Sequence, residues 1–146
     1  MYTYLYIKWH IFQARNLSNK QAQMVNILLI VGHPFIRKML KSQIEIEPDM
    51  HIIAEAIDGP SAFEQARLTN PDLIILDYDM PDMDGLKLIT EFHNALPSIP
   101  VILLGLSDDE VLRFKALSAG AAEFVTKELN TSAFLAAIRR AVPPPK

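Results

Sequence analysis

The sequence predicts an α/β protein in which helices cover both faces of one parallel β-sheet. Beyond residue 24, apolar runs of strand length alternate with segments of helical spacing, which is typical of βαβ units. The runs are apolar throughout, as expected for strands that are buried on both faces. The length of 146 residues fits one domain. With right-handed crossovers, such units form a doubly wound sandwich of about five strands.

Helix-breaking residues set the bounds of the first elements. Pro34 suits the first turn of a helix after the apolar run Asn26–Val31, and Pro48-Asp49 ends that helix. The segment Asp58–Ser61 forms a turn into a second helix, which Asn70-Pro71 stops. The expected strands cover residues 26–31, 50–56 and 72–77, and the expected helices cover residues 34–46 and 61–69.

The second half of the chain repeats this pattern. The segment Ser107–Glu110 favours a helix start, with Ser107 as a hydroxyl cap and acids in the first turn. Gly120 ends this helix, and the prolines at 143–145 cannot extend the last one. The expected strands cover residues 100–106 and 122–126, and the expected helices end near residues 95, 120 and 142.

Composition excludes several classes of protein. The chain has no cysteine, which excludes a disulfide scaffold, a zinc ribbon and a thiol nucleophile and suits a reducing cytoplasm. No apolar run approaches the roughly 18 residues that span a membrane. The net charge of −3 is too small to indicate nucleic-acid binding. We expect a cytoplasmic protein without membrane or direct nucleic-acid partners.

The first 23 residues differ from the rest. Three of the four tyrosines and the only tryptophan lie in the first nine positions, and residues 1–44 hold six basic residues but no acid. Tyr2, Tyr4 and Tyr6 alternate, as in a short strand or an aromatic docking segment. Alternatively, this segment is a translated leader upstream of a start at Met24. We therefore expect an extension at 1–23, one domain at 24–142, and a tail at 143–146 that is a linker or a plain terminus.

In a doubly wound sheet, the functional site lies at the carboxyl ends of the strands, where the strand order reverses. Three loops follow such strand ends here. They are Gly32-His33, Asp77 to Gly85, and Gly105 to Asp108.

The residues of these loops resemble a known family. The segment Leu76–Gly85 (LDYDMPDMDG) resembles the phosphoacceptor loop of response-regulator receiver domains, and Ala119–Lys127 resembles their last strand with its lysine. Gly32-His33-Pro34, and Glu rather than Pro after Lys127, are most similar to the NarL/LuxR-type subgroup, which usually carries a helix-turn-helix output domain. The resemblance implies a flavodoxin-like fold with strand order 2-1-3-4-5. Nothing after Ala141 resembles a DNA-binding domain, so this chain is either a binding protein or the receiver fragment of a transcription regulator.

The resemblance also implies roles for individual residues. Asp77 matches the phosphoacceptor, which takes a phosphoryl group from a histidine kinase or a phosphotransfer protein. Lys127 matches the phosphate-binding lysine, and Phe124 the aromatic switch position. Asp79 would offer its backbone carbonyl to Mg²⁺.

Other positions depart from the family's pattern. The acidic pair that binds Mg²⁺ falls on Val31 and Gly32, and the Ser/Thr that binds the phosphate falls on Gly105. The next residue, usually small, is Leu106, which would crowd the site. Ser107 lies two residues late, in the loop.

These departures predict a degenerate receiver. The family's three carboxylates and one lysine sum to about −2, whereas Asp77 and Lys127 alone sum to about zero, and Mg²⁺ needs several anionic ligands. We expect no cofactor unless His33, Asp79 or Asp82 supplies substitute ligands. His33 more simply precedes the helix-starting proline, and Asp84 more simply caps the next helix.

Three classes of function remain open. The first is a phosphoacceptor receiver in a two-component relay, and the second is a pseudo-receiver that signals through protein contacts alone. The third, a small hydrolase, needs a second nearby acid that the sequence does not provide, so we expect no enzyme. The family's partner or homodimer surface covers residues 108–140. Its apolar positions are Val111, Phe114, Leu117, Phe134, Leu135 and Ile138, some of which must face the core.

Overall fold

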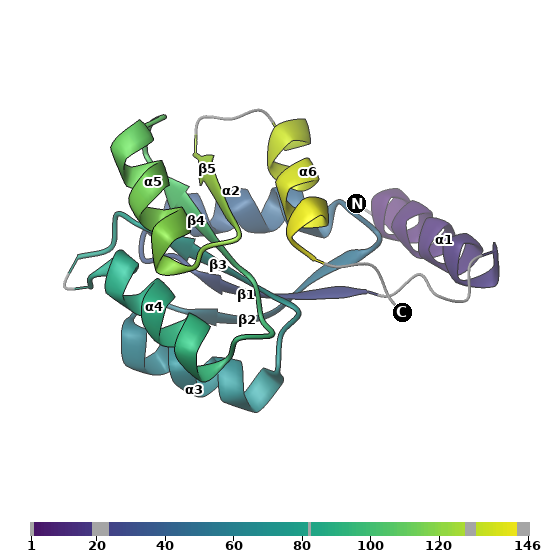
Figure 1. Ribbon diagram of the computed structural model, residues 1–146. Helices are drawn as coiled ribbons and strands as arrows, with labels where there is room; N and C mark the ends of the chain where they lie inside the picture. The colour runs from purple at the N-terminus through teal and green to yellow at the C-terminus, as the bar shows by residue number, and fades with distance from the viewer. Residues whose placement is uncertain (1, 19–23, 82, 128–130, 143–146) are drawn as a thin grey trace.

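The predicted fold class is confirmed by a computed structural model, in which five parallel strands form one sheet of order β2-β1-β3-β4-β5 (Figure 1). The structure describes residues 2–18, 24–81, 83–127 and 131–142, with only the backbone of residues 2 and 12–18. The strands are β1 (Val25–Ile30), β2 (Met50–Ala56), β3 (Leu73–Asp77), β4 (Val101–Gly105) and β5 (Glu123–Thr126). The helices are α1 (Tyr2–Ser18), α2 (Pro34–Glu45), α3 (Gly59–Thr69), α4 (Gly85–Ala95), α5 (Glu110–Ala119) and α6 (Thr131–Ala141).

Strand register brings the functional loops to one edge of the sheet. In the parallel pairing, Ile30 lies beside Leu76, Asp77 beside Leu104, and Gly105 beside Thr126. The residues that follow β1, β3, β4 and β5 therefore emerge side by side. This carboxyl edge is where a doubly wound sheet places its site.

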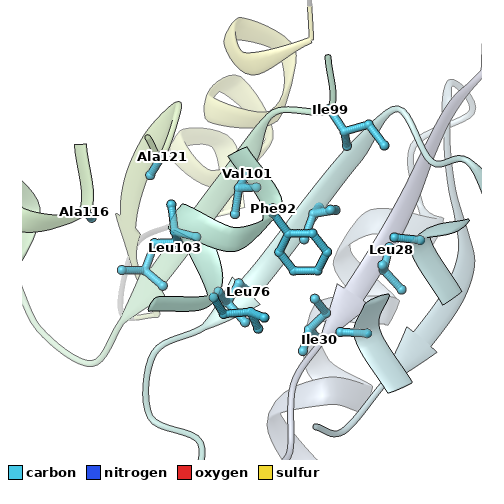
Figure 2. Close-up of a cluster of buried hydrophobic side chains, with 14 of the residues drawn as sticks. Leu28, Ile30, Leu76, Phe92, Ile99, Val101, Leu103, Ala116 and Ala121 are labelled. Atoms are coloured by element: carbon cyan, nitrogen blue, oxygen red, sulfur yellow. The ribbon is translucent and has the colours of Figure 1, made fainter. Parts of the chain in front are cut away.

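Helices cover both faces of the sheet, as the apolar strands predict. Helices α3, α4 and α5 cover one face, and α2 and α6 cover the other (Figure 1). Their buried side chains form two separate cores with the strands. On the first face, the ring of Phe92 lies among side chains that project from the strands (Figure 2). Because each strand contributes alternate residues to the two cores, the register of the carboxyl edge is strongly specified.

Aspartates begin three of the helices that follow this edge. Asp58 Oδ1 accepts from Ser61 N at 2.8 Å, and Asp84 Oδ1 accepts from Lys87 N at 3.2 Å. Asp109 Oδ1 accepts from the backbone N–H groups of both Val111 and Leu112, at 3.0 and 3.1 Å. The prediction of Asp84 as a cap is confirmed. The prediction of a Ser107 hydroxyl cap is wrong, because the helix begins at Glu110 and the Asp109 carboxylate reaches two of its free amides.

The N-terminal segment is a helix, so the prediction of a short strand is wrong. α1 lies near the amino end of β1 (Figure 1). It contacts Glu45, the last residue of α2, through a hydrogen bond from the Tyr4 hydroxyl to its carbonyl (3.0 Å) and an ion pair with Lys8 (3.2 Å). A helix bonds its own backbone and needs no neighbouring strand.

The contact of α1 with the end of α2 also changes the acidity of Tyr4. Burial, and after it the carboxylates of Glu45 and Glu47, raise the pKa of the Tyr4 hydroxyl. The leader interpretation stays a prediction, and residues 19–23 and 143–146 lie outside the described part of the chain. No helix of the described residues is long and apolar enough to cross a membrane.

Candidate functional site

The carboxyl edge brings together the two charged residues that the sequence singles out. Asp77 ends β3, and its residue is 1% exposed. Lys127 directly follows β5, and its backbone N–H donates to the carbonyl of Gly105 at 2.9 Å. This bond fixes the backbone of Lys127 beside the end of β4. The Lys127 ammonium lies 2.6 Å from Asp77 Oδ1, with only 10% of the lysine side chain exposed.

The same ammonium binds a second carboxylate that the sequence analysis missed. Asp79 Oδ2 lies 3.2 Å from Lys127 Nζ, and the backbone N–H of Asp79 donates to Asp77 Oδ1 at 3.0 Å. Asp79 therefore contributes its side chain, and the local charge of the three residues is about −1 rather than about zero. The spacing of two residues was a usable signal, since side chains two apart point to the same side of an extended segment.

The strand end beside Asp77 carries no ligand. Val31 is 0% exposed and packs into the core with α2 and α6. Its carbonyl accepts a hydrogen bond from Arg37 Nη1 at 3.0 Å. Gly32 faces the buried side chain of Met80, and a Cβ on Gly32 would lie 3.6 Å from Met80 Cε, an ordinary contact distance. A side chain at position 32 would therefore start in ordinary contact with the apolar Met80.

The end of β4 is filled by an aromatic ring. A Cβ on Gly105 would lie 2.6 Å from Phe124 Cζ and 2.9 Å from Cε2, closer than side chains can approach. Phe124 itself is 3% exposed. Leu106 is 63% exposed, and its crowding of the site stays a prediction. Ser107 lies in the exposed loop after β4.

These residues do not fit the Mg²⁺ that the family resemblance implies. Among the described residues, no three histidine or carboxylate side chains come together in a way that could hold a metal ion. Asp77 Oδ1 is engaged by Lys127, and His33 Nδ1 accepts from Phe35 N at 3.2 Å as the cap of α2. Asp82, one of the substitute ligands considered, lies outside the described residues. A hard cation needs several oxygen ligands, and the described side chains offer too few.

The expected partner surface is apolar on one helix only. On α5, the side chains of Val111, Phe114 and Leu117 are exposed by 63%, 72% and 47%. The apolar residues of α6 are instead buried, which confirms the expectation that some of these positions face the core and leaves only those of α5 on the surface. The α6 residues face β4 and β5 from the other side of the sheet: Phe134, Leu135 and Ile138.

Comparisons with known proteins agree with this geometry. The family model for the response regulator receiver domain matches residues 27–139. The chain is 32% identical to the nitrate/nitrite response regulator protein NarL of Escherichia coli strain K12 over 125 residues, 86% of this chain and 57% of NarL. It is 38% identical to the protein-glutamate methylesterase/protein-glutamine glutaminase of Caldanaerobacter subterraneus over 108 residues, 73% of this chain and 29% of that protein.

A solved structure gives the same result. The response regulator domain of Thermotoga maritima CheB superposes with a TM-score of 0.74 and 29% identity, covering 84% of this chain and all of that one. The chain spans about half the length, or less, of the curated relatives that it matches. The sheet order, the residues at its carboxyl edge and these matches lead to one conclusion: the chain belongs to the family of response-regulator receiver domains.

Proposed function

We propose that this chain is an atypical receiver that works as a protein-binding module and not as an enzyme. In this proposal, it signals through the surface of α5, β5 and α6 without efficient Mg²⁺-dependent phosphoryl transfer to Asp77. The observation that carries the proposal is that Val31, Gly32 and Gly105 leave the strand ends beside the Asp77–Lys127 ion pair (2.6 Å) without metal or phosphate ligands.

The ion pair adds support because it engages one of the two carboxylate oxygens of Asp77. A phosphoryl acceptor must present a free carboxylate oxygen in line with the leaving group. Asp77 Oδ1 binds the Lys127 ammonium and the backbone N–H of Asp79, which leaves Oδ2 as the one oxygen that could act as nucleophile. With 2% of the Asp77 side chain exposed, this pair is shielded from water and holds the carboxylate in place.

The missing groups support it further. Charge that develops on a transferring phosphoryl group needs fixed positive charge or hydrogen-bond donors. Lys127 is present, but Val31 and Gly32 provide no metal ligand and Gly105 provides no hydroxyl. A metal-free site with one shared lysine leaves most of that charge uncompensated.

The exposed apolar row on α5 supports a binding role. Val111, Phe114 and Leu117 recur at every third position, so they lie along one side of the helix. Large exposed apolar side chains that gather in one place often mark a protein contact. We propose that this row, together with Leu106, contacts a protein partner or a second copy of the chain.

A second candidate is the conventional relay receiver, in which a histidine kinase or a phosphotransfer protein supplies the phosphoryl group. The retention of Asp77 and Lys127 side by side favours it. The likeness to the transcriptional regulatory protein DegU of Brevibacillus brevis, 29% identical over 115 residues, favours placing either kind of receiver in a transcription regulator.

Intact-mass measurement separates the two candidates. The protein is incubated with acetyl phosphate, with and without Mg²⁺, beside Asp77→Ala. The atypical receiver gains no phosphoryl group in either condition. A Mg²⁺-dependent gain of one phosphoryl group in the wild type but not in Asp77→Ala overturns the proposal and restores the relay. A receiver that carries the full acidic pair serves as the positive control for the reagent.

A further inference from the structure

The end of β4 and the middle of β5 fit together through a glycine and a ring. β4 and β5 pair with Leu103 beside Phe124 and Gly105 beside Thr126. The ring of Phe124 reaches along its strand until Cζ would lie 2.6 Å from a Cβ on Gly105. The ring therefore occupies the volume that any side chain at position 105 needs, and only glycine permits this placement.

One side chain of α5 covers the ring. The guanidinium carbon of Arg113 lies 4.9 Å from the centre of the Phe124 ring, within the range of a cation–π contact. Arg113 Nη1 donates to the carbonyl of Phe124 at 3.2 Å, and Nη2 donates to Asp108 Oδ1 at 2.7 Å. Arg113 thus joins α5, the backbone of β5 and the loop after β4.

The Phe124 ring has no polar group that would favour a solvent-exposed position. Phenylalanine has no hydroxyl group to hydrate, and Phe124 is 3% exposed in the core shared by α4 and α5. Turning the ring into water would expose its apolar surface and empty the space above Gly105. It would also remove the cation–π contact of Arg113. All three consequences oppose movement.

We propose that Gly105, Phe124 and Arg113 form a lock that holds the α5–β5–α6 surface in one conformation, whatever the state of Asp77. The inference rests on the proposed function only in taking this surface as the one that signals. The lock itself depends on packing and not on phosphorylation. Phe124 stands at the position that the family uses as a switch. Here Gly105 leaves room for its ring, and Arg113 covers the ring.

Gly105→Ala tests the lock, because it adds only the atom that collides with the ring. Gly32→Ala is the matched control, since its new Cβ would meet Met80 at an ordinary distance of 3.6 Å. Neither glycine has a positive φ, so alanine is compatible with both backbones. NMR of the full chain with labelled phenylalanine measures contacts between the Phe124 ring and residue 105, with Phe124→Leu identifying the signal among seven phenylalanines.

We expect the wild type and Gly32→Ala to show one buried Phe124 ring in contact with residue 105. In Gly105→Ala, that contact is lost, and the amide signals of residues 108–113 shift. If the ring stays in place in Gly105→Ala, or if the wild-type ring already exchanges between two positions, the lock is overturned.

A second variant decides the question should Gly105→Ala not fold. Arg113→Gln removes the cover without adding an atom to the core, and Lys115→Gln on the same helix is its control. The lock predicts faster exchange or a second position of the Phe124 ring in Arg113→Gln only, and equal behaviour in both variants contradicts it. Because these readouts need no phosphate, a phosphorylated Asp77 would overturn the proposed function while an unmoved Phe124 ring would still support the lock.

Discussion

The carboxyl edge of the sheet has two halves that differ in character. Asp77 at the end of β3 and Lys127 directly after β5 are charged and meet at 2.6 Å. Val31-Gly32 directly after β1 and Gly105 at the end of β4 carry no polar side chain. Apolar neighbours fill the second half: Met80 lies against Gly32, and the Phe124 ring lies against Gly105.

The difference shows that packing can fill positions where the family resemblance places polar site residues. A deleted side chain in a close-packed protein leaves a cavity unless a neighbour fills it, and cavities are destabilising. Here both vacated positions border buried apolar side chains, so the edge is continuous with the core. The charged half then depends on the ion pair and on the backbone N–H of Asp79 to keep the Asp77 carboxylate buried.

The largest expected effect comes from breaking that ion pair. Lys127→Ala leaves the Asp77 carboxylate buried with only the backbone N–H of Asp79 as a partner, and removing one member of a buried pair costs about 3–5 kcal/mol. Asp77→Ala costs less, because Lys127 retains the partly exposed Asp79 at 3.2 Å. Chemical denaturation at pH 7 measures both.

The double variant Lys127→Ala/Asp77→Ala completes the cycle and should recover much of the loss seen in Lys127→Ala. Additive effects of the two changes would mean that the pair is not coupled. The charged half of the edge would then not depend on the Asp77–Lys127 ion pair.

The next largest effect on stability is expected when a carboxylate is placed in the apolar half of the edge. The space beside Gly32 admits a Cβ, and the family resemblance places one of the metal-binding acids at this position, so we expect Gly32→Asp to give Mg²⁺ an additional anionic ligand near Asp77 and Asp79. We expect Mg²⁺ to stabilise this variant but not the wild type. A tenfold excess over the dissociation constant would add about 1.4 kcal/mol to the free energy of unfolding.

Thermal unfolding with Mg²⁺ and with matched ionic strength measures this gain. Gly32→Asn, which has the same shape without the charge, should show little of it. A Gly32→Asp variant that Mg²⁺ leaves unchanged would show that the missing acids are not what keeps the metal from this edge.

A smaller effect on stability distinguishes the two candidate caps of α5, Asp109 and Ser107. Asp109→Ala removes an acceptor from two backbone N–H groups of α5, and loss of such a cap costs about 1 kcal/mol. Ser107→Ala, the residue that the sequence pattern favours as the cap, should change the free energy of unfolding little. The reverse order in urea denaturation would restore the sequence-based prediction.

The fold was predictable because its signals are local. Apolar runs such as 26–31, and breaks such as Asn70-Pro71, are visible without any tertiary information, and Asn70 does end α3 in a left-handed conformation (φ 45°). The charged half of the site followed from resemblance. The apolar half did not, because the approach of Phe124 to Gly105 joins residues 19 positions apart on different strands. The Asp79–Lys127 contact and the burial of Phe134 depend on tertiary distance in the same way.

The smallest effect concerns a carboxylate at this edge that belongs to neither half. Hydrogen bonds from the Ser61 side chain, and then from its backbone N–H, hold the pKa of Asp58 below its ordinary value of 3.8. A lowered pKa in the folded state stabilises the protein above the unfolded pKa, and this contribution is lost as the pH falls through the folded pKa. Asp58→Asn keeps an oxygen at the cap but cannot titrate, so the wild type should be slightly more stable at pH 7 and should lose that advantage below about pH 4.

Glu64→Gln on the exposed side of α3 controls for the loss of one negative charge. Denaturation from pH 7 to pH 3 checks the prediction: a difference that does not change with pH would mean that Asp58 acts only through its shape.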